Sequence, residues 1–136
     1  MSTAWQVPAS VRMPAFPWRL LLLAGILLVP ASGTAAQTLL AWQAFVMLLL
    51  SPLAEEVIFR LGLQEALLAR RVSPWCANLL VAVAFGSVHW VVRGDVAALL
   101  VIAPSLLIGA VYQHERRVAP CVCLHALMNL AWLLLA

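Results

Sequence analysis

Apolar residues are gathered in five runs, separated by short polar or charged stretches. The runs cover residues 18–29, 38–59, 74–92, 96–112 and 118–136. Each of the last four is close to the roughly 20 residues that an α-helix needs to cross a bilayer core. Helices satisfy their own backbone hydrogen bonds in lipid. The pattern therefore predicts an all-α, polytopic membrane helix bundle with about five transmembrane helices.

Three stretches fit this pattern less simply. Residues 1–17 contain three prolines and are predicted to form an irregular leader. The short run at 18–29 is predicted to be a span, but it also fits a signal peptide with a small-residue cleavage site at 33–36. The amphipathic stretch at 61–71 either extends the preceding helix or stands alone. Residues 18–136 are predicted to form a single membrane-embedded domain.

Composition supports a membrane location. The chain has 136 residues, of which 65% are hydrophobic and 10% charged, too few polar side chains to cover a soluble domain of this length. Its net charge is +3, and all of its basic side chains other than histidine are arginines. A composition with arginine but no lysine is typical of bacteria with GC-rich codons. Because these arginines lie between apolar runs, membrane topology explains them better than nucleic-acid binding. We expect a bacterial inner (plasma) membrane protein with no nucleic-acid partner.

The arginines also predict an orientation. With the N-terminus inside, the inside segments carry Arg12, Arg19, Arg70, Arg71, Arg116 and Arg117. The outside segments carry Arg93 alone, beside Asp95. Cytoplasmic loops are enriched in Lys and Arg. The count predicts a cytoplasmic N-terminus and an outside C-terminus.

The three cysteines lie in apolar runs, which argues against a secreted disulfide framework. Cys121 and Cys123 are two positions apart and point to different faces of a helix, so they do not suit a metal site. We expect Cys76, Cys121 and Cys123 to be small hydrophobic core residues.

A few polar side chains stand inside the apolar runs. The second run holds Glu55, Glu56 and Arg60. Ionisable groups at membrane depth are costly, and they usually face an interior cavity and serve a function. Glu56 and Arg60 have the i, i+4 spacing of an ion pair on one helix face. Glu55 has no such partner, because Arg60 already pairs with Glu56, and it is therefore a candidate general base.

Two later runs bring further polar groups. His89 lies in the run at 74–92, and His125 and Asn129 lie four residues apart in the last run. The i, i+4 pair projects from one helix face and suits an oxyanion hole, which needs fixed hydrogen-bond donors. Either histidine alone also fits a structural role, but the convergence of three helices favours an active site. His114 lies in the charged stretch at 113–117, and we expect it to be solvated.

These residues resemble the motifs of a known family. Residues 55–60 read Glu-Glu-Val-Ile-Phe-Arg and resemble the E-E-x-x-x-R motif of the CAAX protease and bacteriocin-processing (Abi) family. Phe85-x-x-x-His89 and His125-x-x-x-Asn129 resemble its second and third motifs, in the same order. The resemblance covers residues 52–132, which we treat as the motif core of the domain.

The resemblance implies a glutamate-type intramembrane endopeptidase. Glu55 would act with His89 to activate a water for attack on a peptide bond. His125 and Asn129 would stabilise the oxyanion. No metal or other cofactor is required in this mechanism, and the partner would be a membrane-associated protein or peptide substrate within the lipid bilayer.

The same resemblance assigns Glu56 and Arg60 a supporting role, in which they hold the helix and tune Glu55. The chain departs from the family in size. The Ras-converting CAAX endoproteases have more helices, so prenylated CAAX substrates do not follow from the motifs. Small bacterial members include bacteriocin-processing, self-immunity and protein-sorting types.

Other readings of the motifs stay open. In a zinc protease, Glu55, His89 and His125 would be three ligands that leave an open position for water, although the chain has no His-Glu-x-x-His sequence. A serine protease is disfavoured because Ser87 lacks a rhomboid-type Gly-x-Ser-Gly context. An aspartyl protease is excluded because Asp95 is the only aspartate. A non-catalytic immunity or assembly factor could bind a peptide in the same cavity.

An active site requires that the three motifs lie at a similar depth in the membrane. At ~1.5 Å per residue, His89 lies about 24 Å beyond the inside edge of its run, whereas His125 lies only about 12 Å beyond Arg117. Glu55 reaches the depth of His89 only if its helix continues to Arg70. An active site therefore requires tilted helices, or a last helix that begins deeper.

Overall fold

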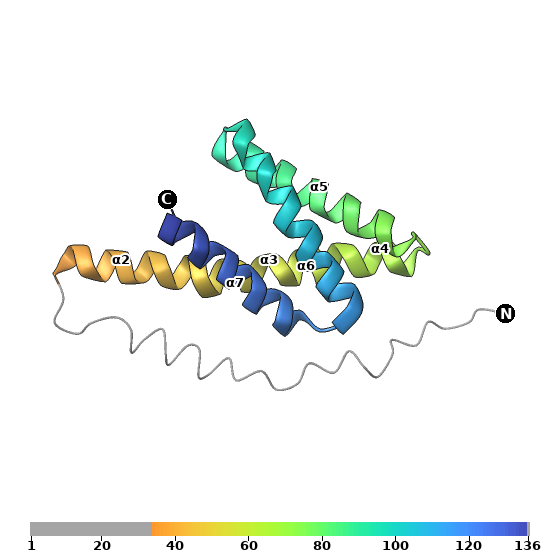
Figure 1. Cartoon of the computed structure of the whole chain (residues 1–136), viewed down its shortest axis with the longest axis horizontal. Helices are drawn as coiled ribbons and strands as arrows, with labels where there is room; N and C mark the ends of the chain where they lie inside the picture. Colours follow the sequence, from red (N-terminus) through yellow and green to blue (C-terminus); the bar gives the residue numbers. More distant parts are fainter. Residues whose placement is uncertain (1–33, 136) are drawn as a thin grey trace.

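The computed structural model describes residues 34–135, so the predicted leader and first apolar run lie outside the described residues. Within residues 34–135 the chain is helical apart from short turns and contains no strand (Figure 1). The elements are α2 (Ala35–Phe45), η2 (Val46–Leu50), α3 (Ser51–Glu56), η3 (Val57–Gln64), α4 (Glu65–Ala69), α5 (Pro74–Arg93), η4 (Val96–Val101), α6 (Ile102–Glu115) and α7 (Val118–Leu135). The predicted all-α, polytopic fold is confirmed.

The first five elements form one continuous helix over residues 35–69, seen as a single rod in Figure 1. It begins at a capping box: the Thr34 hydroxyl accepts from the Gln37 backbone N–H at 3.4 Å, and the Gln37 side chain accepts from the Thr34 N–H at 2.8 Å. At 1.5 Å per residue the helix is about 50 Å long. The polar stretch after residue 60 therefore extends the second apolar run.

Two segments of this helix, η2 and η3, have the wider hydrogen-bonding pattern of a π-helix. They flank α3, whose six residues include both glutamates of the first motif. π-helical turns are rare, and they occur frequently at functional sites. The helix is therefore irregular on both sides of Glu55 and Glu56.

Helices α5 and α6 form an antiparallel hairpin joined through η4 (Figure 1). Ser73 caps α5 by accepting from the Cys76 backbone N–H at 3.3 Å, and Pro74 occupies the first turn, where no backbone donor is needed. Gly94 ends α5 with a left-handed φ of 69°, which glycine adopts without steric cost. Asp95 then caps η4.

Helix α7 follows a turn at Arg116 and packs on α6, on α3 and on η2. A small core joins α6 to the first half of α7. Its buried members are Ile108, Tyr112, Val118, Cys121 and Val122. Because Val118 is the first residue of α7 and is already buried, α7 begins inside the bundle rather than at its edge.

Large apolar side chains cover much of the outside. Trp75, Val91 and Leu134 are each more than three-quarters exposed, at 76%, 77% and 77%. Lipid accommodates such a surface, which water does not favour. Among the described residues, three helical segments are long and apolar enough to cross a membrane: Pro74–Arg93, Val96–Glu115 and Val118–Leu135. This is an integral membrane protein.

The cysteines differ from the expectation that all three belong to the core. Cys121 is buried, whereas Cys76 and Cys123 are exposed. The prediction was wrong for these two because most of a membrane helix faces lipid, where a small apolar side chain needs no protein neighbour. The two-residue spacing of Cys121 and Cys123 does place them on different faces.

Candidate functional site

Six polar side chains are buried at the centre of the described bundle. They come from all its parts: Glu56, Arg60, Gln64, Asn78, Ser105 and His125. Buried polar groups are stable only when they are paired or hydrogen-bonded. The contacts that satisfy them define the site.

Arg60 is the centre of the buried network. Its Nε donates to Glu56 Oε2 at 2.8 Å, and both side chains are completely buried. The guanidinium also donates to Gln64 Oε1 at 3.2 Å, and to the hydroxyl and backbone carbonyl of Ser105 at 2.9 Å each. The pair expected from the i, i+4 spacing is therefore present and joins the long helix to α6.

Glu56 has a second contact, to His125. Its Oε1 lies 2.8 Å from Nδ1 of His125, a residue 69 positions away in the sequence. Because an ionised carboxylate only accepts hydrogen bonds, Nδ1 of His125 is the donor. This contact turns Nε2 of His125 toward Glu55, at 3.7 Å from Oε2.

Glu55 lies between the two histidines. Its Oε1 accepts a hydrogen bond from the hydroxyl of Ser51, one turn earlier. Its Oε2 lies 3.9 Å from Nε2 of His89 and 3.7 Å from Nε2 of His125. Oε2 is buried and has no hydrogen-bond partner among residues 34–135. These separations are too long for direct hydrogen bonds and suit one bridging water.

His89 is held by its own helix. Its Nδ1 lies 3.0 Å from the backbone carbonyl oxygen of Phe85. Because a carbonyl only accepts, Nδ1 carries the hydrogen, and Nε2 is the ring nitrogen that lies toward Glu55. The Phe85 ring packs on both imidazoles, with centroids 4.3 Å from His89 and 5.9 Å from His125. Phe85 therefore restricts both rings.

Asn129 lies one turn beyond His125 on α7. Its Nδ2 donates to the backbone carbonyl of Met47 at 2.8 Å, which ties α7 to η2. The amide has two hydrogens, so one remains for a ligand. Both Asn129 and His125 line a cavity.

The structure explains how Glu55, His89 and His125 can lie at the same depth, which the sequence did not settle. The helix that carries Glu55 continues to Ala69, and α7 begins within the core at Val118. The structure therefore brings Glu55, His89 and His125 together although their distances from the helix ends differ.

The cavity has a volume of about 320 Å³. His89, His125 and Asn129 lie on its wall, and the cavity extends from them toward the turn that joins α5 to η4. Its other walls are largely apolar, with side chains such as Phe85 and Trp132. A mostly apolar pocket with a few convergent polar groups is typical of a ligand site.

His114, the third histidine of the chain, lies outside this site. His114 ends α6 with a side chain that is 87% exposed, 4.0 Å from Glu115. Within residues 34–135, no group of three or more His, Cys, Asp or Glu side chains has the arrangement that would hold a metal ion.

Comparison of the sequence with known proteins identifies the family of the chain. A family model described as type II CAAX prenyl endopeptidase Rce1-like matches residues 37–131. The chain belongs to this family. The match includes all three motifs and confirms the resemblance. Comparison with curated proteins and with solved structures gave no match. Membership in the type II CAAX prenyl endopeptidase family implies an integral membrane protease, and hence a hydrolase, that acts on a membrane-associated protein.

Sequence reasoning missed several residues of this candidate site. Ser51 contacts Glu55, and Gln64 contacts Arg60, each at i, i+4. Spacing alone could have identified both. Asn78 and Ser105 are isolated polar residues in apolar runs, which could have marked them as buried hydrogen-bonding groups. Nothing local predicts that Glu56 contacts His125.

Proposed function

We propose that this chain is a glutamate-type intramembrane endopeptidase that hydrolyses a peptide bond in a membrane-associated protein or peptide. One observation carries the proposal. Oε2 of Glu55 lies 3.9 Å and 3.7 Å from the Nε2 atoms of His89 and His125, two residues that line a largely apolar cavity. A candidate general base, two imidazoles that can exchange protons and a cavity for the substrate therefore lie close enough to share one bound water.

The first step is attack by water. The water is held between Oε2 of Glu55 and Nε2 of His89, and Glu55 takes one of its protons. The water oxygen bonds to the peptide carbonyl carbon, and the carbonyl electron pair moves onto oxygen. The hydroxyl of Ser51 holds the other carboxylate oxygen, which directs Oε2 toward the water.

The second step depends on stabilisation of that oxyanion. The free amide hydrogen of Asn129 is one donor. His125 is the other: in its imidazolium form it donates from Nε2 while Nδ1–H stays bound to Glu56. When the carbonyl re-forms, the C–N bond breaks and the departing amine takes the proton from Glu55. The products are a carboxylic acid and an amine, and transfer of the remaining proton from the acid to the amine leaves a carboxylate and an ammonium group.

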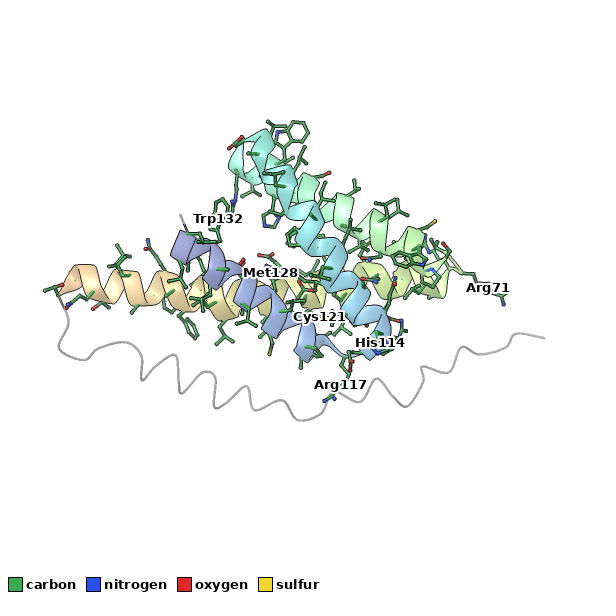
Figure 2. The ribbon with its side chains drawn as sticks, viewed as in Figure 1. Arg71, His114, Arg117, Cys121, Met128 and Trp132 are labelled. Atoms are coloured by element: carbon green, nitrogen blue, oxygen red, sulfur yellow. The ribbon has the colours of Figure 1, made fainter. Side chains whose placement is uncertain are left out.

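The orientation of the protein in the membrane is part of the proposal. The turn after α4 carries Arg70 and Arg71, and the turn after α6 carries Arg116 and Arg117. Figure 2 places Arg71 and Arg117 away from the tip of the α5–α6 hairpin. By the positive-inside rule the arginine-rich end is cytoplasmic. We assign the protein to the bacterial inner membrane with a cytoplasmic N-terminus.

Two other functions would use the same side chains. A zinc-dependent protease would use Glu55, His89 and His125 as ligands, and its activity would fall on chelation and return with zinc. A non-catalytic factor would bind a peptide in the cavity. In that case its cellular role would survive replacement of Glu55 by Gln.

The proposal is tested in cells that carry either the wild-type protein or the variant Glu55→Gln. The termini of all membrane proteins and peptides are compared by mass spectrometry. At least one protein or peptide should accumulate uncleaved with Glu55→Gln. Glu115→Gln, which changes a glutamate at the end of α6, is the matched control. Identical sets of termini in all three strains would contradict proteolysis.

A further inference from the structure

Two helix ends on the arginine-rich side of the bundle carry arginine where glycine is usual. Arg71 follows α4 with a φ of 62°, and Arg116 ends α6 with a φ of 52°. At the other end of the α5–α6 hairpin, Gly94 holds the same left-handed conformation with a φ of 69°. A Cβ atom makes this conformation costly, whereas glycine adopts it freely. Both arginines therefore occupy positions that the backbone would leave to glycine.

The contacts of Arg116 account for its position, but Arg71 has no comparable contact. Nη2 of Arg116 donates to Glu65 Oε2 at 3.0 Å, and the guanidinium lies 5.7 Å from the centroid of the Tyr112 ring. The ion pairs formed by arginines within residues 34–135 involve Arg60 and Arg116, not Arg71. Figure 2 shows the side chain of Arg71 directed away from the bundle. A costly backbone position without a protein partner points to a ligand.

Membrane orientation alone does not explain the position of Arg71. The positive-inside rule counts basic residues near the ends of a span and does not depend on their backbone conformation. Arg70 and Arg117 already supply such charges at this end, and a glycine at position 71 would avoid the backbone cost. The charge at position 71 therefore has a more local use.

The turn that carries Arg70 and Arg71 has a defined shape. The backbone N–H of Arg71 donates to the Leu68 carbonyl at 2.9 Å, and that of Val72 donates to the Leu67 carbonyl at 3.1 Å. These two bonds form a Schellman motif, which closes the end of α4. Both arginines are exposed. Two free guanidinium groups therefore extend from a fixed turn directly before α5.

The first half of α5 presents an apolar surface next to this turn. Trp75, Leu79 and Val83 are each at least 44% exposed, and their spacing of four residues places them along one side of the helix. The helix is a candidate membrane span that begins at Pro74, so Trp75 lies near the membrane–water interface, where tryptophan is enriched. Cations at the membrane surface are thus followed by an apolar surface that continues toward the hydrocarbon.

We propose that this turn binds the headgroup of an acidic phospholipid. Arg70 and Arg71 bind the phosphate, and the acyl chains lie against Trp75 and Leu79. A guanidinium makes paired, charge-assisted hydrogen bonds to a phosphate. The phosphate of phosphatidylglycerol has no cation in its own headgroup, whereas that of phosphatidylcholine is accompanied by a quaternary ammonium group. The turn therefore selects the acidic lipid, independently of the proposed hydrolysis.

The test uses purified protein in a non-ionic detergent, to which phosphatidylglycerol or phosphatidylcholine with the same acyl chains is added. Native mass spectrometry counts the lipids bound to each protein molecule and measures their affinities. The wild-type protein should bind one phosphatidylglycerol about 25-fold more tightly than phosphatidylcholine. This value follows because each of two basic residues near an acidic headgroup contributes about fivefold in affinity.

The arginines are then varied. Arg71→Gln should lower the preference about fivefold, and Arg70→Gln/Arg71→Gln should abolish it. Arg71→Lys should keep part of it, because the charge remains while the paired donors are lost. Arg117→Gln is the matched control: it removes the same charge from the neighbouring turn and should leave the preference unchanged.

The variant Arg71→Gly separates lipid binding from a structural role. Glycine fits the left-handed position, so the lipid-free variant should unfold at a temperature no lower than the wild-type protein. Added phosphatidylglycerol should raise the unfolding temperature of the wild-type protein and of Arg117→Gln more than that of Arg71→Gly.

Four results would overturn the inference. The wild-type protein could bind both lipids alike, or bind neither. The preference could survive Arg70→Gln/Arg71→Gln. Finally, Arg71→Gln and Arg117→Gln could weaken binding of phosphatidylglycerol equally, which would indicate a diffuse effect of net charge in place of a site at this turn.

Discussion

At the scale of single residues, the carboxylate of Glu55 is oriented by its neighbour Ser51. The hydroxyl of Ser51 occupies Oε1, so the free Oε2 faces His89 and His125. The hydroxyl of Ser51 is already bound to Glu55, so we expect it to act on that carboxylate and not on the substrate. It is therefore a positioning residue, whose effect on the reaction passes through Glu55.

The variant Ser51→Ala should lower kcat/KM about tenfold, because it removes a hydrogen bond to a charged group. Its pH–rate profile should move, since the carboxylate loses a donor, and Ser51→Thr should restore both values. Ser87→Ala is the matched control, because that hydroxyl donates to the Val83 carbonyl on the outside of α5. If Ser51→Ala and Ser87→Ala behave alike, Ser51 has no positioning role.

Arg60 is predicted to matter for stability. Arg60→Met leaves the carboxylate of Glu56 buried without its partner, which should cost about 3–5 kcal/mol. The loss is measured by denaturant unfolding in detergent micelles. The double variant Glu56→Gln/Arg60→Met should recover part of it, since no unpaired charge then remains. A change below about 1 kcal/mol for Arg60→Met would show that the pair does not support the bundle.

At the scale of elements, Gly109 of α6 packs closely against side chains of α5 and η3. A Cβ atom there would lie 1.8 Å from Oδ1 of Asn78 and 2.9 Å from Nη1 of Arg60. Asn78 cannot move freely, because it is buried and its Nδ2 donates to the Leu106 carbonyl at 3.0 Å. The absence of a side chain at Gly109 therefore lets the buried network form.

Gly109→Ala should destabilise the protein by about 1–3 kcal/mol, as overpacking typically does. It should also slow cleavage, because a displaced Arg60 no longer fixes Glu56. Gly62→Ala is the control: its Cβ would meet only the Val57 carbonyl, at 3.7 Å, and alanine favours a helix. Thermal unfolding of both variants measures the difference. Equal stability would contradict close packing at Gly109.

The elements also show what the sequence could and could not predict. The runs at 74–92, 96–112 and 118–136 correspond to α5, to η4 with α6, and to α7, because length and hydrophobicity alone define a span. Local spacing also predicted the pair of Glu56 and Arg60. The contact between Glu56 and His125 depends on how α7 is inclined and how deep it begins, which packing decides. The π-helical segments likewise have no simple sequence signal.

At the scale of the whole molecule, the charges predict which end of the bundle faces the cytoplasm. Single cysteines are placed at Arg71 or at Val96, both exposed, in a protein whose three native cysteines are replaced by alanine. A membrane-impermeant thiol reagent added to intact cells with a permeabilised outer membrane should label Val96→Cys but not Arg71→Cys. The opposite labelling pattern would reverse the orientation.

The central proposal is that peptide-bond hydrolysis by this protein depends on Glu55. The direct measurement is the rate at which purified protein in liposomes cleaves the substrate that accumulates in cells carrying Glu55→Gln. The wild-type protein and Glu115→Gln should cleave it at similar rates in the presence of a chelator, whereas Glu55→Gln should bind it and be at least about 1,000-fold slower. Cleavage by Glu55→Gln at the wild-type rate would contradict the account.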